Sequence, residues 1–302
     1  MLSSTTRRSR FKRGMLQKSK PSLQRGFSLF EVAIVLVIVA ILFTAVGVPL
    51  ASQVQARRIE ETRKLLEEAK DALLGFAVAN GRFPCPAIAT SVGQESFCPA
   101  GSPTGTCGGS ETTVVQTHGN CSNFYNGFLP AAALGLSGLD QQGFLRDPWV
   151  EEANRIRYAV YSPNRDSPPT TVGGENHPFT RPGGMQSATL TVLGDATAAS
   201  PYMHVCASGT GVTASSCGAT PANTLTTRAP ILLYSLGPNA SAIISGTTTA
   251  GTDEAENLPA SNNKVFVSHT PVDGGANQFD DVVTWISIST IIKKMLDAGK
   301  LP

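Results

Sequence analysis

The sequence lacks the short motifs that mark the common enzyme classes. It contains no Gly-x-Ser-x-Gly, Gly-x-x-x-x-Gly-Lys, His-Glu-x-x-His or Gly-x-Gly-x-x-Gly. Charged residues are also scarce, at 15 % of 302 residues. One spacing brings a base near a nucleophile, His204 with Cys206, and a structural cysteine beside an ordinary histidine is the simpler interpretation. We therefore predict that the chain is not an enzyme.

Acidic residues are absent from residues 1–26, although eight of the 24 lysines and arginines lie there. The rest of the chain holds 16 basic and 22 acidic residues, so a basic head precedes a mildly acidic body. Nucleic-acid-binding domains cluster Lys and Arg on a folded surface. This charge distribution argues against a nucleic-acid partner for the folded part.

No cysteine precedes residue 85, no Cys-x-x-Cys spacing occurs, and the four histidines lie far apart, which argues against zinc. An even number of cysteines in Gly- and Ser-rich loops instead indicates disulfides formed in an oxidising compartment. The sequence leaves the connectivity open, with Cys206–Cys217 and pairs within 85–121 as the simplest arrangements. The six candidates are Cys85, Cys98, Cys107, Cys121, Cys206 and Cys217.

An apolar run without charge occupies residues 32–50. At about 1.5 Å per residue it nearly spans a hydrocarbon core of about 30 Å, and Phe27, Leu29 and Phe30 extend it. The positive-inside rule keeps the basic head in the cytoplasm and places the bulk of the chain outside. The sequence therefore predicts a single-pass membrane protein.

Two simpler interpretations of this run are a cleaved secretory signal and a plain anchor. A secretory signal has a shorter apolar core of about 7–15 residues and ends in a small-x-small site, which residues 49–56 do not offer. A plain anchor fits the length. It leaves Glu31 unexplained, because a carboxylate at the start of a membrane segment is costly unless it is paired, and an acid in this position therefore indicates a function.

Residues 25–31, with the sequence RGFSLFE, and the apolar run after them resemble the processing site of type IV prepilins and type II secretion pseudopilins. The resemblance implies cleavage by prepilin peptidase between Gly26 and Phe27, N-methylation of Phe27, and a role for Glu31 in assembly. It also implies other pilin or pseudopilin subunits and an inner-membrane assembly platform as partners. The head would lie in the bacterial periplasm before the subunit enters a filament.

Physical chemistry agrees with these roles. Gly26 lets an extended backbone enter a protease cleft without a Cβ clash. Cleavage would create an ammonium group on Phe27, and the Glu31 carboxylate of a neighbouring subunit would pair with it in a low-dielectric environment. Neutralising both charges would let apolar helices pack together.

The helix is expected to continue beyond the membrane. Residues 51–80 contain good helix formers, and Ile59, Leu66, Ala69, Leu73 and Phe76 form one apolar face. Asn80-Gly81 is typical of a helix end. The expected organisation is a removed leader, a transmembrane and assembly helix, an amphipathic stem and a periplasmic head, at 1–26, 27–50, 51–80 and 81–302.

The head is expected to be a small antiparallel β-sheet of short strands packed against the long helix, an α+β fold of the ladle-shaped pilin type. Residues rich in β-branched side chains or alternating in polarity predict strands. We expect a short helix within 128–147, a terminal helix at 289–298, and loops at 163–187 and 238–262. The expected strands are 155–161, 189–193, 231–236, 264–268 and 282–288.

Three stretches of the head resemble the major pseudopilin of type II secretion: 147–158, 234–237 and 281–285. Relative to that family, residues 85–125, 163–230 and 239–279 look like insertions, which makes a minor or tip subunit a second interpretation. In the resembled family an aspartate at the place of Asp281 helps to bind calcium. Other oxygens are available from Asp253, Glu254, Glu256 and Asp280, and the alternative is an ordinary solvated surface.

The leading functional hypothesis is a structural subunit of a type II secretion pseudopilus or a type IV pilus. The alternative is a minor or tip pilin whose disulfide-pinned loops bind a surface, an exported protein or DNA. A third, weaker hypothesis is a membrane-anchored enzyme, which would tolerate loss of Glu31.

Overall fold

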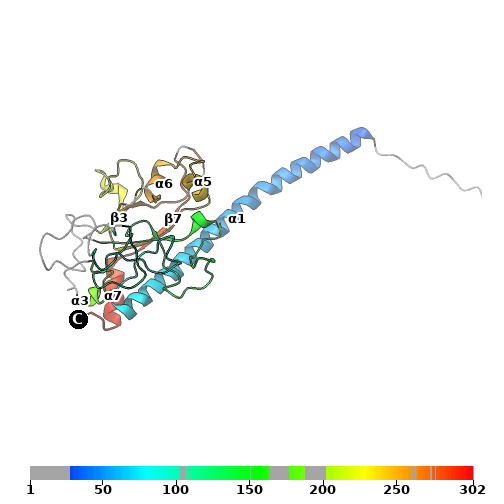
Figure 1. The fold of residues 1–302 in the computed structure, drawn as a ribbon. Helices are drawn as coiled ribbons and strands as arrows, with labels where there is room; N and C mark the ends of the chain where they lie inside the picture. Colours follow the sequence, from blue (N-terminus) through cyan, green and yellow to red (C-terminus); the bar gives the residue numbers. More distant parts are fainter. Residues whose placement is uncertain are drawn as a thin grey trace, which may run out of the picture. The chain divides into compact units, whose positions relative to one another are not determined.

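The chain forms two compact units, Met1–Gln53 and Val54–Pro302, which are described separately. Helix α1 runs from Leu29 to Asn80, so the boundary between the units falls within it (Figure 1). The computed structural model describes residues 28–102, 107, 109–149, 151–162, 177–187, 202–259, 261, 263–272, 274–275 and 277–301.

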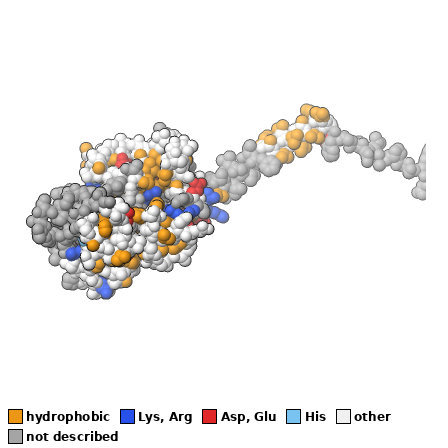
Figure 2. Space-filling model, in the orientation of Figure 1, with side chains coloured by type: hydrophobic (Ala, Val, Ile, Leu, Met, Phe, Trp, Pro, Cys, Tyr) orange, Lys and Arg blue, Asp and Glu red, His pale blue; other side chains and the backbone are white. Residues whose placement is uncertain are grey.

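Exposed apolar side chains cover the described start of α1 in the first unit (Figure 2). Leu29 is 89 % exposed and Phe30 73 %, and the apolar side chains that follow up to Ile41 are exposed as well. The structure does not describe the side chains of residues 42–52. Among the residues that are described, no helix combines the length and the apolar character needed to cross a membrane.

In the second unit, α1 buries one face in the core. Leu66, Ala69 and Leu73 are at most 1 % exposed, which confirms the apolar face predicted from their spacing. The helix ends at Asn80, whose side-chain amide donates to a backbone carbonyl one turn earlier. Gly81 follows with φ +66°, the left-handed conformation that terminates helices.

The first sheet is antiparallel and has the strand order β1-β2-β5-β7. Its two central strands, β2 and β5, are buried along their whole length, so neither has a solvated face. The strands expected at 155–161, 231–236 and 282–288 are thus confirmed with shorter bounds. The four strands are β1 (Gly127–Phe128), β2 (Arg157–Val160), β5 (Ile231–Ser235) and β7 (Val282–Ile286).

A second sheet of three strands, ordered β4-β3-β6, was not foreseen. The strands β3 (Met203–Cys206) and β4 (Thr224–Ala229) pair antiparallel, whereas β3 and β6 (Val265–Val267) pair parallel. Only β6 was expected from the sequence. The head is therefore α+β as predicted, but its described residues form two sheets where a single antiparallel sheet was expected, and one strand pair is parallel.

Short helices complete the described fold. Helix α7 (Ile288–Asp297) confirms the expected terminal helix, and its N-cap Ser287 accepts a hydrogen bond from the Thr290 N–H at 3.3 Å. The prediction of a loop at 238–262 was wrong in part, because this segment contains two helices. These and the remaining short elements are α3 (Gly184–Ser187), α5 (Ala240–Ile244), α6 (Thr252–Asn257), η1 (Glu152–Asn154) and η2 (Pro221–Asn223).

The prediction of a short helix within 128–147 was also wrong. This segment forms turns, because Gly135, Gly138 and Gly143 adopt φ values of +69°, +74° and +80° that a right-handed helix cannot contain. The strand expected at 189–193 lies outside the described residues.

Candidate functional site

Glu31 lies in the first turn of α1, on a stretch whose other described side chains, from Leu29 to Ile41, are all apolar. Its side chain is exposed, as are its apolar neighbours. A carboxylate at a helix N-terminus interacts favourably with the helix dipole. The candidate processing residues Gly26 and Phe27 lie outside the described residues.

All six cysteines are paired. The disulfides are Cys85–Cys121, Cys98–Cys107 and Cys206–Cys217, with Cα–Cα distances of 5.3, 4.6 and 5.4 Å. These pairings agree with the expectation of disulfides within 85–121 and between the last two cysteines. They hold loops that contain few regular elements.

The nucleophile weighed from the sequence is not a free thiol. Cys206 is bonded to Cys217, so no thiolate is available beside His204 while the disulfide is intact. A second nucleophile–base contact joins Ser162 Oγ and His177 Nδ1 at 2.5 Å, but both side chains are at most 1 % exposed. A substrate therefore has no path to this pair in the described structure, and the contact is a packed core hydrogen bond.

Three acidic side chains of the second unit meet in the interior, and we call them the carboxylate triad. They are Glu254 on α6 and Asp280 and Asp281, which directly precede β7. One oxygen from each lies within 4.8 Å of the others, and the three residues are 1 %, 2 % and 3 % exposed. Buried like charges at this separation are unfavourable without a compensating cation.

The backbone is shaped around the triad at Gly237, which follows β5. Its φ is +69°, and a Cβ at this position would lie 2.0 Å from Asp280 Oδ1. Glycine is therefore required both by the conformation and by the close approach of the carboxylate.

The triad is incompletely satisfied by hydrogen bonds. Glu254 Oε1 accepts from Asn239 Nδ2 at 2.7 Å, and Asp281 Oδ2 accepts from Asn257 Nδ2 at 2.8 Å. Asp281 Oδ1, by contrast, is buried and has no hydrogen-bond partner among the described residues. Burial raises the pKa of Asp281 well above its usual value, and the Glu254 and Asp280 carboxylates raise it further, against a lowering by the Asn257 hydrogen bond.

These residues fit a hard divalent cation. Calcium takes six to eight oxygen ligands from carboxylates, amide oxygens and water. The triad has three carboxylates, an unsatisfied buried oxygen on Asp281, and a glycine that admits Asp280. Arg157 interacts electrostatically with Asp281 and offsets only part of this negative charge.

The structure places the other two candidate acids elsewhere. Asp253 accepts hydrogen bonds from Ser208 Oγ at 3.0 Å and Asn277 Nδ2 at 2.7 Å, and it contacts His269 Nε2 at 3.1 Å. Burial would raise the pKa of Asp253, but these partners and the Gly209 N–H hold it below its usual value. Glu256 is half-buried and is not part of the triad.

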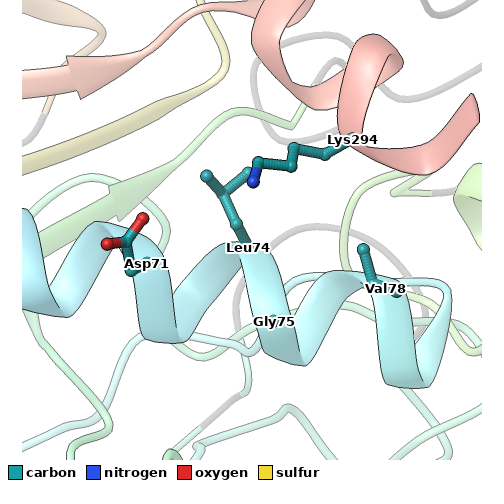
Figure 3. Close-up of a pocket in the computed structure, with 5 residues that line it drawn as sticks. All are labelled: Asp71, Leu74, Gly75, Val78 and Lys294. Atoms are coloured by element: carbon teal, nitrogen blue, oxygen red, sulfur yellow. The ribbon is translucent and has the colours of Figure 1, made fainter. Parts of the chain in front are cut away.

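A surface groove that was not predicted lies between α1 and α7 of the second unit. It has a volume of about 430 Å³ and is lined by five residues. Figure 3 shows Lys294 of α7 extending toward Leu74 of α1, with Asp71 and Val78 on the flanking turns of α1. Gly75 lies on α1 between them, and a Cβ added there would meet nothing within 4 Å.

The sequence could point to part of the triad but not to its surroundings. Asp281 was named through the family resemblance, with Glu254 and Asp280 as further oxygen donors, whereas Asn257 and Gly237 were not assigned to the site. The available signal was the Gly237 that follows a buried apolar strand, because a glycine there is typical of a close approach or a left-handed turn.

Comparison with known proteins matches residues 21–47 to the family model of the prokaryotic N-terminal methylation motif. Searches of curated proteins and of solved structures found no match. The matched segment contains the candidate processing residues Gly26 and Phe27 and the exposed Glu31. The chain therefore carries at its N-terminus the prepilin-type signature of pilins and pseudopilins.

Proposed function

We propose that this chain is a structural subunit of a type IV pilus or a type II secretion pseudopilus. Prepilin peptidase removes residues 1–26 by cutting after Gly26, and Phe27 becomes the methylated N-terminus. The observation that carries the proposal is the methylation motif at residues 21–47. A structural role fits this motif better than catalysis.

The exposed apolar start of α1 supports assembly through this helix. Side chains from Leu29 to Ile41 present an apolar surface that water solvates poorly. A lipid bilayer before assembly and neighbouring subunits afterwards would cover it. In this proposal residues 27–50 cross the bacterial inner membrane, residues 51–80 form the stem, and residues 81–302 form a periplasmic head that later joins the filament.

Glu31 is the one charged group within this apolar surface. Its carboxylate would pair with the ammonium of Phe27 on a neighbouring subunit, which removes two unpaired charges from the filament core. The partners of the subunit are thus the peptidase, other pilin-like subunits and an inner-membrane assembly platform.

Intact mass and N-terminal peptide sequencing of protein recovered from membranes test the processing step. We expect a chain that starts at Phe27 and carries one additional methyl group. The Gly26→Ala variant should accumulate as the longer precursor, because the added Cβ obstructs the cleavage site. A precursor that is cut normally in this variant, or a wild-type chain without methylation, would contradict the proposal.

We also propose that the carboxylate triad binds a divalent cation, with calcium as the best fit. The supporting observation is the buried Asp281 Oδ1, which has no hydrogen-bond partner in the described part of the chain and lies beside two further carboxylates. Calorimetric titration of calcium into detergent-purified protein should give binding that Asp281→Asn weakens at least tenfold. Equal affinity in both proteins would exclude the triad as the site.

A further inference from the structure

The side chain of Asn257 connects the carboxylate triad to the second sheet. Asn257 is the last residue of α6 and is 1 % exposed. Its Nδ2 donates to Asp281 Oδ2 at 2.8 Å and to the Val267 carbonyl at 2.9 Å. Its Oδ1 accepts from the Val267 N–H at 2.9 Å. Both amide hydrogens and one oxygen lone pair are therefore used, which leaves the side chain a single orientation.

On the Val267 side, Asn257 imitates a neighbouring strand. Val267 ends β6, an edge strand of the second sheet that pairs with β3 on one side. The paired N–H and C=O contacts of Asn257 satisfy backbone groups that an edge strand otherwise leaves open. Asn257 thus holds β6 on the side that does not pair with β3.

On the triad side, the Asn257 amide donates to Asp281, whose carboxylate lies close to two other carboxylates. Asp281 lies beside Glu254 and Asp280, and repulsion among the three carboxylates favours displacement of Asp281 when no cation neutralises them. A bound cation reverses this repulsion and keeps Asp281 Oδ2 in place to accept from Asn257. The cation therefore affects Asn257 without any direct contact with it.

The connection continues into the disulfide-bonded part of the second sheet. Val267 pairs with Cys206 in the parallel β3–β6 ladder, and the Ser268 N–H donates to the Cys206 carbonyl at 2.9 Å. Cys206 is bonded in turn to Cys217. Loss of the Asn257 contact would leave β6 with its bonds to β3 alone, so its outer edge would open more often.

We propose that cation binding at the carboxylate triad locks strand β6 into the second sheet, with Asn257 as the residue that transmits the effect. The proposal rests on the cation site proposed above. Asn257 is a positioning residue in this scheme, because it holds Asp281 and β6 together and contributes no ligand. Calcium outside the cell membrane would then control the order of this part of the head.

Hydrogen exchange of the full chain in detergent, measured by mass spectrometry with calcium or with a chelator, tests the proposal. We expect calcium to slow exchange of the Val267 and Ser268 amides at least tenfold. Amides of α1 around Leu66 and Leu73, which are buried and are not part of the triad, should not respond and serve as an internal reference. Calcium that binds without changing exchange in β6 would overturn the locking proposal and leave the cation site intact.

Two variants separate the transmission from the binding. Asn257→Leu should still bind calcium, with an affinity lowered by about the factor of protection that β6 gains in the wild type, because the coupling is reciprocal, and should lose the calcium-dependent protection of β6. Asp281→Asn retains an oxygen that accepts from Asn257, so β6 should be protected to the same degree with and without calcium. A calcium response of β6 that persists in either variant would contradict the role of Asn257.

Asn223→Ala is the matched control, since Asn223 also donates to backbone carbonyls near the disulfide, at Ser208 and Cys217, but does not contact Asp281. Its β6 should respond to calcium as the wild type does, and loss of that response would count against a specific path through Asn257. If the wild type binds no calcium, both cation proposals fail. The N-terminal mass measurement judges the filament proposal independently of either result.

Discussion

At the scale of single residues, Asp140 shows how one carboxylate organises a loop that has little regular structure. Its Oδ2 accepts from Arg146 Nε at 2.9 Å and from Arg155 Nε at 3.0 Å, and its Oδ1 accepts from the Phe144 N–H at 2.9 Å. Burial alone would raise the pKa of Asp140, but the Phe144 N–H and the two guanidinium groups hold it below its usual value. The loop is therefore stabilised by an ionised carboxylate.

Asp140→Asn should lower the free energy of unfolding by about 1–3 kcal/mol at pH 7, because hydrogen bonds to a charged group are lost. A lowered folded-state pKa contributes stability that is complete above the unfolded-state pKa and is lost as the pH falls through the folded-state value. The difference between variant and wild type should therefore shrink below about pH 4. Urea unfolding of the purified protein at pH 7 and pH 3 measures both quantities.

Asp297→Asn is the control for this experiment, because Asp297 forms an exposed ion pair with Lys293 at 2.7 Å. Such pairs contribute little to stability, so this variant should unfold like the wild type at both pH values. A loss in Asp140→Asn that is equally large at pH 3 would mean that packing, and not the charge, is responsible.

At the scale of elements, α1 combines a tightly packed face with an exposed face that includes a glycine. Gly75 lies in the interior of the helix at the groove between α1 and α7, where a Cβ would meet nothing within 4 Å. Neither packing nor backbone conformation requires glycine there. The residue therefore weakens the helix without a compensating contact in the described structure.

Gly75→Ala should raise the free energy of unfolding by about 1 kcal/mol, the difference in helix propensity between the two residues. Thermal unfolding followed by circular dichroism should show a midpoint about 2–4 °C higher. Gly237→Ala is the opposing control and should destabilise, because its Cβ would lie 2.0 Å from Asp280 Oδ1 at φ +69°. If Gly75→Ala were less stable than the wild type, the added Cβ would have to clash with atoms at this position, which would contradict the open space around Gly75.

At the scale of the whole molecule, the exposed apolar surface of α1 and the disulfide-bonded head have different physical requirements. The described part of the first unit, up to Ile41, exposes apolar side chains and needs a lipid or protein partner. The second unit has a core of its own, built from α1, the first sheet and α7, and a smaller cluster around Cys206, Cys217 and Phe279. A filament subunit needs both properties.

Glu31→Gln should leave cleavage after Gly26 intact and reduce the amount of subunit in sheared filaments at least tenfold. The substitution keeps the size of the side chain and removes the charge that pairs with the Phe27 ammonium in the proposed assembly. Immunoblots of the filament and membrane fractions, with the mass of the N-terminal peptide, separate assembly from processing. Glu61→Gln changes an exposed acid of the stem and should assemble normally. Equal filament yields from both variants would exclude the charge-pairing mechanism.

Local patterns in the sequence predicted the elements that depend on local physics. The apolar face through Leu66 and Leu73, the helix end at Asn80-Gly81 and the terminal helix α7 all follow from spacing and capping, and all are confirmed. Helix α6 was missed because its six residues, TDEAEN, include a single apolar one and so show no apolar periodicity. Its place comes from contacts of Glu254 and Asn257 with residues more than ten positions away in the chain.

The sequence by itself determined the signature at residues 21–47, the position of Glu31 in an apolar run, and a cysteine content that favours disulfides, because each depends on residues close together in the chain. Only the tertiary structure decided which cysteines pair, that β3 and β6 join in parallel, and that Glu254 meets Asp280 and Asp281. These contacts bridge up to dozens of residues, and their free energy comes from burial that exists only once the head is folded.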